Sequence, residues 1–226
     1  MAGIVKSMKM HKKLVSFWRF FIFISFLSII SAGCSQPYWN DRYFSTLPPE
    51  QQKVELKKYL DVKFEDPQKL FMLGQLYHRD KQWDNAEFYY TNSLRFDPFY
   101  RPAQAAMIKL ALDRGDQAEA QKYFDMYINQ AGKSTDKLIE LALEFQQQNL
   151  DTYALSCYQK ALEIDPNSAK TYKYLGYYYL YKDDKAKAKE AFEKSFNIDR
   201  VQPDVALELG RLEVPIVYPT QANTTE

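Results

Sequence analysis

Five consecutive segments of this chain share one 34-residue frame without insertion or deletion, and they begin at residues 67, 101, 135, 169 and 203. The seventh position of the frame holds an unbranched or γ-branched apolar residue: Leu73, Met107, Leu141, Leu175 and Leu209. The eighth is small in four of the five segments, as Gly74, Ala142, Gly176 and Gly210. The twentieth is alanine and the twenty-fourth aromatic in the first four segments, as Ala86, Ala120, Ala154 and Ala188, then Tyr90, Phe124, Tyr158 and Phe192. A fixed period of this length indicates a stack of similar units.

The spacing of these positions predicts a pair of helices in each unit. Positions 4, 7, 8 and 11 lie on one face of a first helix, and positions 20, 24, 27 and 28 lie on one face of a second, because residues three, four and seven apart are helical neighbours. Small residues at positions 8 and 20 let the two helices approach closely, and the aromatic ring at position 24 fills the space beside them. A polar turn such as Lys182-Asp183-Asp184 separates them. A single helix pair cannot bury its apolar face, so neighbouring pairs are expected to stack.

These positions resemble the tetratricopeptide repeat (TPR) family, and the segment ALSCYQKALEIDP at 154–166 is very similar to the family pattern. The resemblance implies an all-α fold, a TPR solenoid of stacked antiparallel helix pairs that forms a right-handed superhelix. It covers four full repeats, at 67–100, 101–134, 135–168 and 169–202.

The second repeat departs from the family pattern at four positions: Gln104, Ile108, Tyr127 and Gly132. We therefore expect the same helix pair with a different packing. Capping helices are predicted on both sides of the repeats. The N-terminal one, in 48–66, presents Val54, Leu56, Tyr59 and Leu60; the C-terminal one, in 203–213, presents Leu207, Leu209 and Leu212. Residues 214–226 contain two prolines and a polar end, and are predicted to be an extended or disordered tail.

The N-terminal 33 residues resemble a bacterial lipoprotein signal. Five basic residues precede an uncharged apolar run at 20–30, and Ser31-Ala32-Gly33-Cys34 follows. The resemblance implies acylation of Cys34, cleavage before it, and a tether at 34–47. An uncleaved membrane anchor is the alternative, but a span needs about 20 apolar residues. Ser35 after the cysteine points, by the sorting rule of enteric bacteria, to the outer membrane facing the periplasm.

Charge and motifs argue against nucleic-acid binding and catalysis. Without residues 1–33 the chain carries 25 Lys+Arg against 29 Asp+Glu, and no basic stripe remains. Acylation of Cys34 would leave Cys157 without a cysteine partner, so no disulfide framework is expected. The sequence has no His-Glu-x-x-His, Cys-x-x-Cys or Gly-x-Gly-x-x-Gly motif. We therefore expect no enzyme, no cofactor and no metal site.

The TPR resemblance implies that function resides in a concave groove lined by the first helices, at positions 2, 5, 6, 9, 12 and 13 of each repeat. The residues predicted to contact a partner there are Phe71, Gln75, His78, Lys109, Ile139, Leu143, Lys173, Tyr174, Tyr177 and Tyr181. The same positions include Arg79, Asp113 and Gln147. The TPR pattern that clamps a peptide carboxylate is not matched, since only Lys173 and Arg79 are of the right type.

The groove residues suggest a protein scaffold or adaptor whose partner is a segment of another cell-envelope protein, because tyrosine suits recognition. Two alternatives remain open. One is binding of a glycan or peptidoglycan fragment by the aromatic groove, and the other is a self-associating structural subunit of an envelope assembly.

Overall fold

The structure is a computed structural model in which residues 39–213 are described, and within that range it contains α-helices and no strand. The predicted signal, Cys34 and the tail at 214–226 lie outside the described residues. The chain divides into two compact units, one ending at Leu47 and the other beginning at Pro48.

The first unit contains one short described helix, α2 (Asp41–Thr46). The side chain of Asn40 caps it by accepting a hydrogen bond from the amide of Tyr43 at 3.1 Å. The rings of Trp39 and Phe44 pack with their centroids 4.7 Å apart. The segment predicted as a tether therefore includes a helical turn, which the aromatic pair and the cap stabilise locally.

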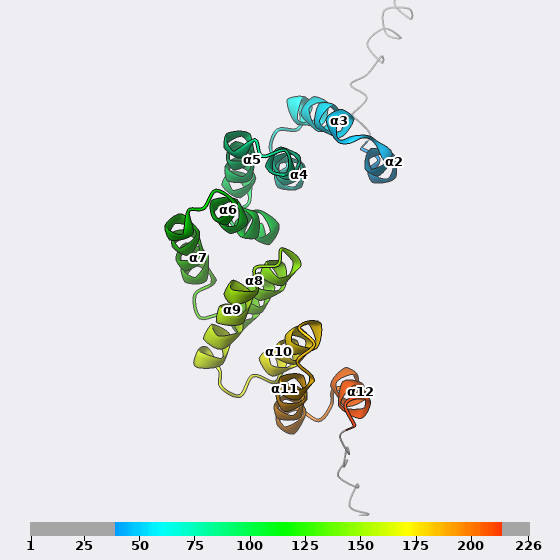
Figure 1. Cartoon of the computed structure of the whole chain (residues 1–226), viewed down its shortest axis with the longest axis vertical. Helices are drawn as coiled ribbons and strands as arrows, with labels where there is room; N and C mark the ends of the chain where they lie inside the picture. The colour runs from blue at the N-terminus through cyan, green and yellow to red at the C-terminus, as the bar shows by residue number, and fades with distance from the viewer. Residues whose placement is uncertain (1–38, 214–226) are drawn as a thin grey trace, which may run out of the picture. The chain divides into compact units, whose positions relative to one another are not determined.

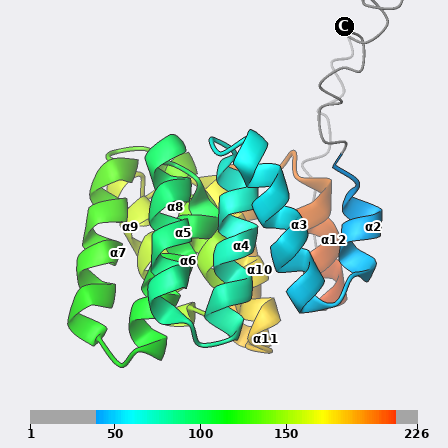
Figure 2. The ribbon, with the colours of Figure 1, turned by 90° about the horizontal axis from the view of Figure 1, so that it is seen from above.

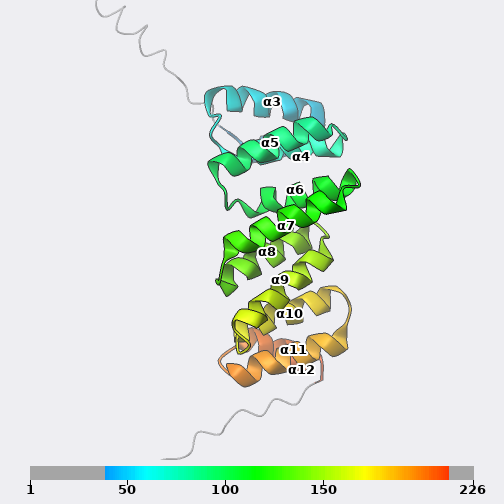
Figure 3. The same ribbon diagram turned by 90° about the vertical axis from the view of Figure 1, so that its left-hand side faces the viewer.

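The second unit consists of helices that follow one another in chain order along the stack (Figures 1 and 3). The first helix of every segment begins at position 1 of the 34-residue frame. The predicted all-α TPR solenoid of stacked helix pairs is confirmed. Its helices are α3 (Pro49–Val62), α4 (Pro67–Arg79), α5 (Trp83–Phe96), α6 (Arg101–Asp113), α7 (Gln117–Ala131), α8 (Thr135–Gln147), α9 (Asp151–Ile164), α10 (Ala169–Tyr181), α11 (Lys185–Ile198) and α12 (Pro203–Arg211).

The same turn joins the two helices of all four repeats. The backbone at position 15 has a positive φ, from 56° to 84°, in Lys81, Gly115, Asn149 and Asp183. The amide at position 16 donates to the carbonyl at position 11, as from Gln82 to Tyr77 at 2.9 Å. This bond, with one from position 15 to position 12, forms the motif that ends helices at a left-handed residue. The turn therefore has the same backbone conformation in every repeat, and its residues occupy equivalent positions.

Close approach within the pairs follows the small and aromatic positions. A Cβ atom built on Gly74 would lie 2.6 Å from the ring of Tyr90, and one on Gly176 would lie 2.5 Å from the ring of Phe192. The hydroxyl of Ser195, at position 27, donates to the carbonyl of Ala169 at 2.8 Å. Glycine at position 8 therefore provides the space that the ring at position 24 occupies.

The second repeat forms its helix pair by a different packing. Gln104 is fully buried, and its amide nitrogen donates to the carbonyl of Pro98 at 2.7 Å and to the side-chain oxygen of Gln130 at 2.9 Å. Its own side-chain oxygen accepts from Arg101 at 2.8 Å. Ile108 is fully buried at the position where glycine or alanine stands elsewhere. The polar group is accommodated because its hydrogen bonds are satisfied.

The capping helices bury only part of the predicted apolar sets. In α3, Leu56 and Leu60 are buried, whereas Val54 is exposed. In α12, Leu209 is buried and Leu212 partly buried, but Leu207 is exposed, and Val205 and Ala206 are buried instead. Val54 and Leu207 remain exposed because only one face of each capping helix contacts a neighbouring helix.

Successive first helices also contact one another, since α4 touches α6, α6 touches α8 and α8 touches α10. Seen from above, helices α4 to α7 lie with their long axes roughly aligned (Figure 2). The first helices thus share one layer, on which any site built from several repeats must lie. Among residues 39–213, no helix has both the length and the apolarity needed to cross a bilayer.

Candidate binding site in the first-helix layer

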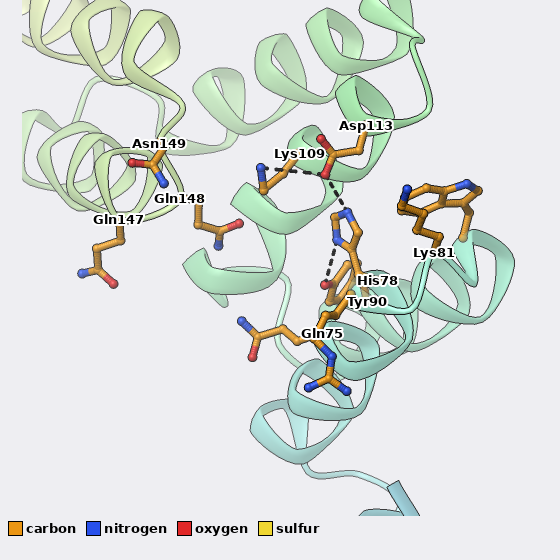
Figure 4. Close-up of a pocket in the computed structure, with 11 residues that line it drawn as sticks. Gln75, His78, Lys81, Tyr90, Lys109, Asp113, Gln147, Gln148 and Asn149 are labelled. Atoms are coloured by element: carbon orange, nitrogen blue, oxygen red, sulfur yellow. Dashed lines mark hydrogen bonds and ion pairs between the residues drawn. The ribbon is translucent and has the colours of Figure 1, made fainter. Parts of the chain in front are cut away.

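A polar pocket of about 640 Å³ lies where the first three repeats meet. We call it the groove pocket (Figure 4). Helices α4, α5 and α6 supply most of the wall, and the turn after α4, the end of α8 and the turn after α8 supply the rest. The lining residues are Gln75, His78, Arg79, Lys81, Trp83, Tyr90, Lys109, Asp113, Gln147, Gln148 and Asn149.

His78 joins three helices at the centre of this wall. Its Nε2 lies 2.9 Å from Oδ2 of Asp113 on α6, and its Nδ1 lies 3.2 Å from the hydroxyl of Tyr90 on α5. The contacts fit a neutral ring that donates from Nε2 to the carboxylate and accepts at Nδ1 from the tyrosine. The Trp83 ring packs edge-on against His78, with centroids 5.5 Å apart. His78 therefore couples the first repeat to the second at the surface of the pocket.

The pocket has more positive than negative charge. Three cationic side chains, Arg79, Lys81 and Lys109, face one carboxylate, Asp113. The ammonium of Lys109 lies 3.8 Å from that carboxylate, which also accepts from His78. Because burial lowers the pKa of His78, this ring is neutral near pH 7 and adds no charge to the pocket. Arg79 also pairs with Asp80, which does not line the pocket, Nε to Oδ1 at 3.2 Å. The lining itself still holds three cations against one carboxylate, which favours an anionic group.

Burial of His78 predicts a pH-dependent stability. Burial lowers its pKa below the ordinary 6.5, and Asp113 opposes this only in part. Below about pH 6.5 the unfolded chain binds a proton that the folded chain takes up only at lower pH, so the free energy of unfolding should fall as pH decreases through this range. The melting temperature, measured at several pH values between 7.5 and 5.5, tests this prediction.

The matched variant for this prediction is His78→Gln, whose amide can still donate to Asp113 and accept from Tyr90. Its melting temperature should change less over the same pH range than that of the unmodified chain. Equal pH dependence in the two proteins would assign the effect to other groups. The chain's other histidine, His11, lies in the predicted signal.

Three of the ten predicted contact residues line the pocket: Gln75, His78 and Lys109. A fourth lies at its edge, because the hydroxyl of Tyr181 donates to Oδ1 of Asn149 at 3.2 Å. Tyr181 is among the exposed aromatic residues. The structure thus brings these four side chains to one region from α4, α6 and α10.

Two predicted contact residues are buried and do not present a surface to a partner. Phe71 is 8 % exposed, with its ring centroid 5.7 Å from that of Tyr90 and 5.6 Å from that of Tyr100. Ile139 is 2 % exposed. Their frame positions were correct, but the prediction that they line the groove was wrong, since neighbouring side chains cover them.

The remaining predicted residues are partly buried and lie outside the groove pocket. Lys173 pairs with Asp204 of α12, Nζ to Oδ2, at 3.1 Å. The ring of Tyr177 packs edge-on against Phe192 with centroids 5.1 Å apart. Tyr174 and Leu143 are partly exposed. These side chains form a second, less polar stretch of the layer, and their contact with a partner stays a prediction.

Five lining residues were not predicted from the groove positions: Lys81, Trp83, Tyr90, Gln148 and Asn149. Lys81, Gln148 and Asn149 belong to the turns at positions 14 and 15, where the left-handed residue directs the chain toward the layer. Tyr90 is a core residue whose hydroxyl reaches His78. The recurring polar turn in the frame was the available signal for the first three.

The chemistry of nucleophiles and metals finds no support in residues 39–213. Cys157 is fully buried, and burial raises the pKa of its thiol far above the ordinary value. Within this part of the chain, no group of three or more His, Cys, Asp or Glu side chains is placed to hold a metal ion.

Residues 157–190 match the family model described as a tetratricopeptide repeat. No curated protein matches the sequence. Similar solved structures include MamA (41-end) from Desulfovibrio magneticus RS-1, with 22 % identity over 68 % of this chain and 87 % of that one and a TM-score of 0.35. PilF of Pseudomonas aeruginosa is 24 % identical over 65 % of this chain and 67 % of that one, with a TM-score of 0.36. YrrB, described as a TPR protein with an unusual peptide-binding site, is 18 % identical over 72 % and 84 %, with a TM-score of 0.37.

The family match begins within α9, the second helix of the third repeat, and covers most of the fourth repeat; the 34-residue frame extends the same pattern to both sides. Residues 48–213 therefore form a stack of TPR-type helix pairs with one helix added at each end.

Proposed function

We propose that this protein is a membrane-anchored TPR lipoprotein that acts as a protein–protein interaction scaffold or adaptor in the bacterial cell envelope. The observation that carries the binding half of this proposal is the groove pocket. It is open, polar and built from three repeats, and it joins side chains far apart in sequence on the layer that TPR proteins use for recognition.

The surplus of cations in the pocket indicates the chemistry of the partner. An acidic side chain could accept hydrogen bonds from Lys109 and Arg79 while its neighbours contact Trp83. The partner in this proposal is an extended or helical segment that carries at least one acidic residue. Charges of this kind favour encounter and orientation more than raw affinity.

The anchoring half of the proposal rests on the sequence. Acylation of Cys34 would hold the chain at a membrane, and several acyl chains are needed for stable anchoring. Ser35 favours the outer membrane, facing the periplasm. The lipid would keep the repeats near the envelope proteins that the groove pocket is proposed to bind.

Photo-crosslinking in the native cells tests the binding half. A photo-reactive residue at Gln75, which is exposed within the pocket, should capture a discrete envelope protein. The matched position is Lys160 on the second helix α9, which does not line the pocket, and it should not capture that protein. Capture at neither position, or equal capture at both, would contradict groove binding.

Mass spectrometry of the N-terminus and cell fractionation test the anchoring half. The mature chain should begin with acylated Cys34, and Cys34→Ser should release it from the membrane fraction or leave it unprocessed. An intact N-terminus in the unmodified protein would replace the lipoprotein by a membrane anchor, without affecting the crosslinking result.

A second candidate function is recognition of a glycan or peptidoglycan fragment. Four amide side chains, Gln75, Gln147, Gln148 and Asn149, line the pocket together with Trp83. Amides suit hydroxyl groups, and aromatic faces suit sugar rings. Retention of the purified protein on cell-wall material, lost in Trp83→Ala and combined with no protein capture at Gln75, would favour this candidate.

A further inference from the structure

A second hollow, of about 410 Å³, lies between α3 and α5 and shares no residue with the groove pocket. We call it the α3–α5 groove. Leu60, Leu70 and Leu73 are buried and form its floor. The other lining residues are Lys57, Asp61, Phe64, Phe88, Tyr89, Asn92, Arg95 and Phe96.

Two phenylalanine rings of this groove are exposed to an unusual degree. Phe88 is 60 % exposed on α5, and Phe64, in the turn between α3 and α4, is 57 % exposed. The rings of Phe64 and Phe96 pack edge-on, with centroids 5.8 Å apart. The rings of Phe88 and Tyr89 also pack edge-on, with centroids 5.1 Å apart. Contiguous exposed apolar side chains of this kind mark interaction surfaces.

The repeat frame shows that the fold does not require these rings. Phe88 stands at position 22, where the later repeats have Lys122, Ser156 and Glu190. Phe64 stands 34 residues before Pro98, a position that is Gly132 and Pro166 in the next two repeats. Since those repeats form the same helix pairs with polar or turn residues at these positions, the aromatic surface is an addition specific to the first repeat.

We propose that the α3–α5 groove binds a second copy of this chain in a two-fold symmetric dimer. A two-fold contact brings the same surface of both copies together, so that surface must be complementary to itself. The groove meets this condition in shape, because it offers a protruding ring, Phe88, beside a hollow with a leucine floor. In the dimer, Phe88 of each copy enters the hollow of the other.

The charges at the edge of the groove also meet this condition. Lys57 and Arg95 are positive and Asp61 is negative, so a two-fold arrangement can place opposite charges across the contact on both sides. An anionic membrane surface would be matched by basic residues alone. The mixture of signs therefore favours a second copy over a lipid surface. The two linings share no residue, so this inference does not depend on the proposed function.

Photo-crosslinking of the full chain in its native cells tests the contact directly. A photo-reactive residue at Phe88 should give a product of two copies, with the crosslinked peptides both from the α3–α5 groove. The same residue at Lys122, the equivalent exposed position of the second repeat, should give none. A product with lipid or with another protein, or no product at Phe88, would overturn the proposal.

Sedimentation velocity of the purified full chain over a range of concentrations provides the second test. Phe88→Glu should raise the dimer dissociation constant by about 10-fold or more, as for a central aromatic contact residue. Lys122→Glu should leave it unchanged. Because Phe88 is largely exposed, the variant should melt at the temperature of the unmodified protein. A monomer at all concentrations, or equal effects of the two variants, would contradict the dimer.

Discussion

Replacing Gly176 by alanine should destabilise the fold by about 1–3 kcal/mol, although alanine is the better helix former. The added Cβ atom would lie 2.5 Å from Cε1 and 2.6 Å from Cδ1 of Phe192. That ring is fully buried in a cluster with Ala188, Phe196, Val205 and Leu209, so it cannot move without displacing the contact between α11 and α12. The clash therefore affects the interface with the C-terminal cap as well as the helix pair.

The chain contains its own control for this prediction at the same frame position. A Cβ atom on Gly210 would meet nothing within 4 Å. Gly210→Ala should therefore stabilise the chain by up to about 1 kcal/mol, from helix propensity alone. Thermal and denaturant unfolding of the two variants, followed by circular dichroism, should give shifts of opposite sign.

A double-mutant cycle assigns the Gly176 effect to the ring. Phe192→Leu removes Cε1, the ring atom nearest to the new methyl group, and replaces the rigid ring by a smaller side chain. Gly176→Ala should therefore cost less in that background than in the unmodified chain. Equal costs in both backgrounds would show that the loss has another source. A higher melting temperature for Gly176→Ala alone would contradict the packing argument.

The architecture was predictable because its determinants repeat. Gly176 and Phe192 are sixteen residues apart, and the same offset separates Gly74 from Tyr90. Each copy of the pair imposes the same close helix approach, and the left-handed turn at position 15 returns the chain in the same way each time. Agreement among several repeats makes the assignment far stronger than any one segment could.

The second repeat was harder to predict because its packing relies on contacts between distant residues. Gln104 is an unfavourable core residue when considered alone. Its partners, Pro98 and Gln130, lie 6 and 26 residues away, and only the folded helix pair brings them to 2.7 and 2.9 Å. A hydrogen-bond network of this kind has no regular spacing by which it could be recognised in the sequence.

The sequence predicted which helix face carries the candidate site, but not which side chains on that face are buried. The frame places Phe71 and His78 on the same helix face, seven residues apart. Phe71 is covered by Tyr90 and Tyr100, whereas His78 reaches the pocket and meets Asp113. Which side chain is covered depends on the size of its neighbours on adjacent helices, so periodicity alone overestimated the aromatic lining and missed the turn residues.

Reversing two charges in the groove pocket should reduce capture of the partner at Gln75 by about 10-fold or more. The variant is Arg79→Glu with Lys109→Glu. It leaves Lys81 as the remaining cation among the lining residues that the structure describes, beside Asp113 and two new carboxylates. An acidic partner segment would then meet repulsion where the unmodified pocket offers attraction, and raising the salt concentration should weaken capture by the unmodified protein but not further weaken the variant.

The control on another face is Lys160→Glu, which changes the net charge by half as much as the double variant. The Lys160 side chain is 49 % exposed and paired with Glu163, and that of Lys109 is 42 % exposed and paired with Asp113, so the two lysines differ mainly in which face they occupy. New like-charge pairs on a helix cost about 0.5 kcal/mol or less, so both proteins should remain folded at the growth temperature. If Lys160→Glu reduces capture as much as the double variant, the effect is one of net charge. If neither reduces it, the partner segment is not held by an acidic group, and recognition must rest on Trp83 and the amide side chains instead.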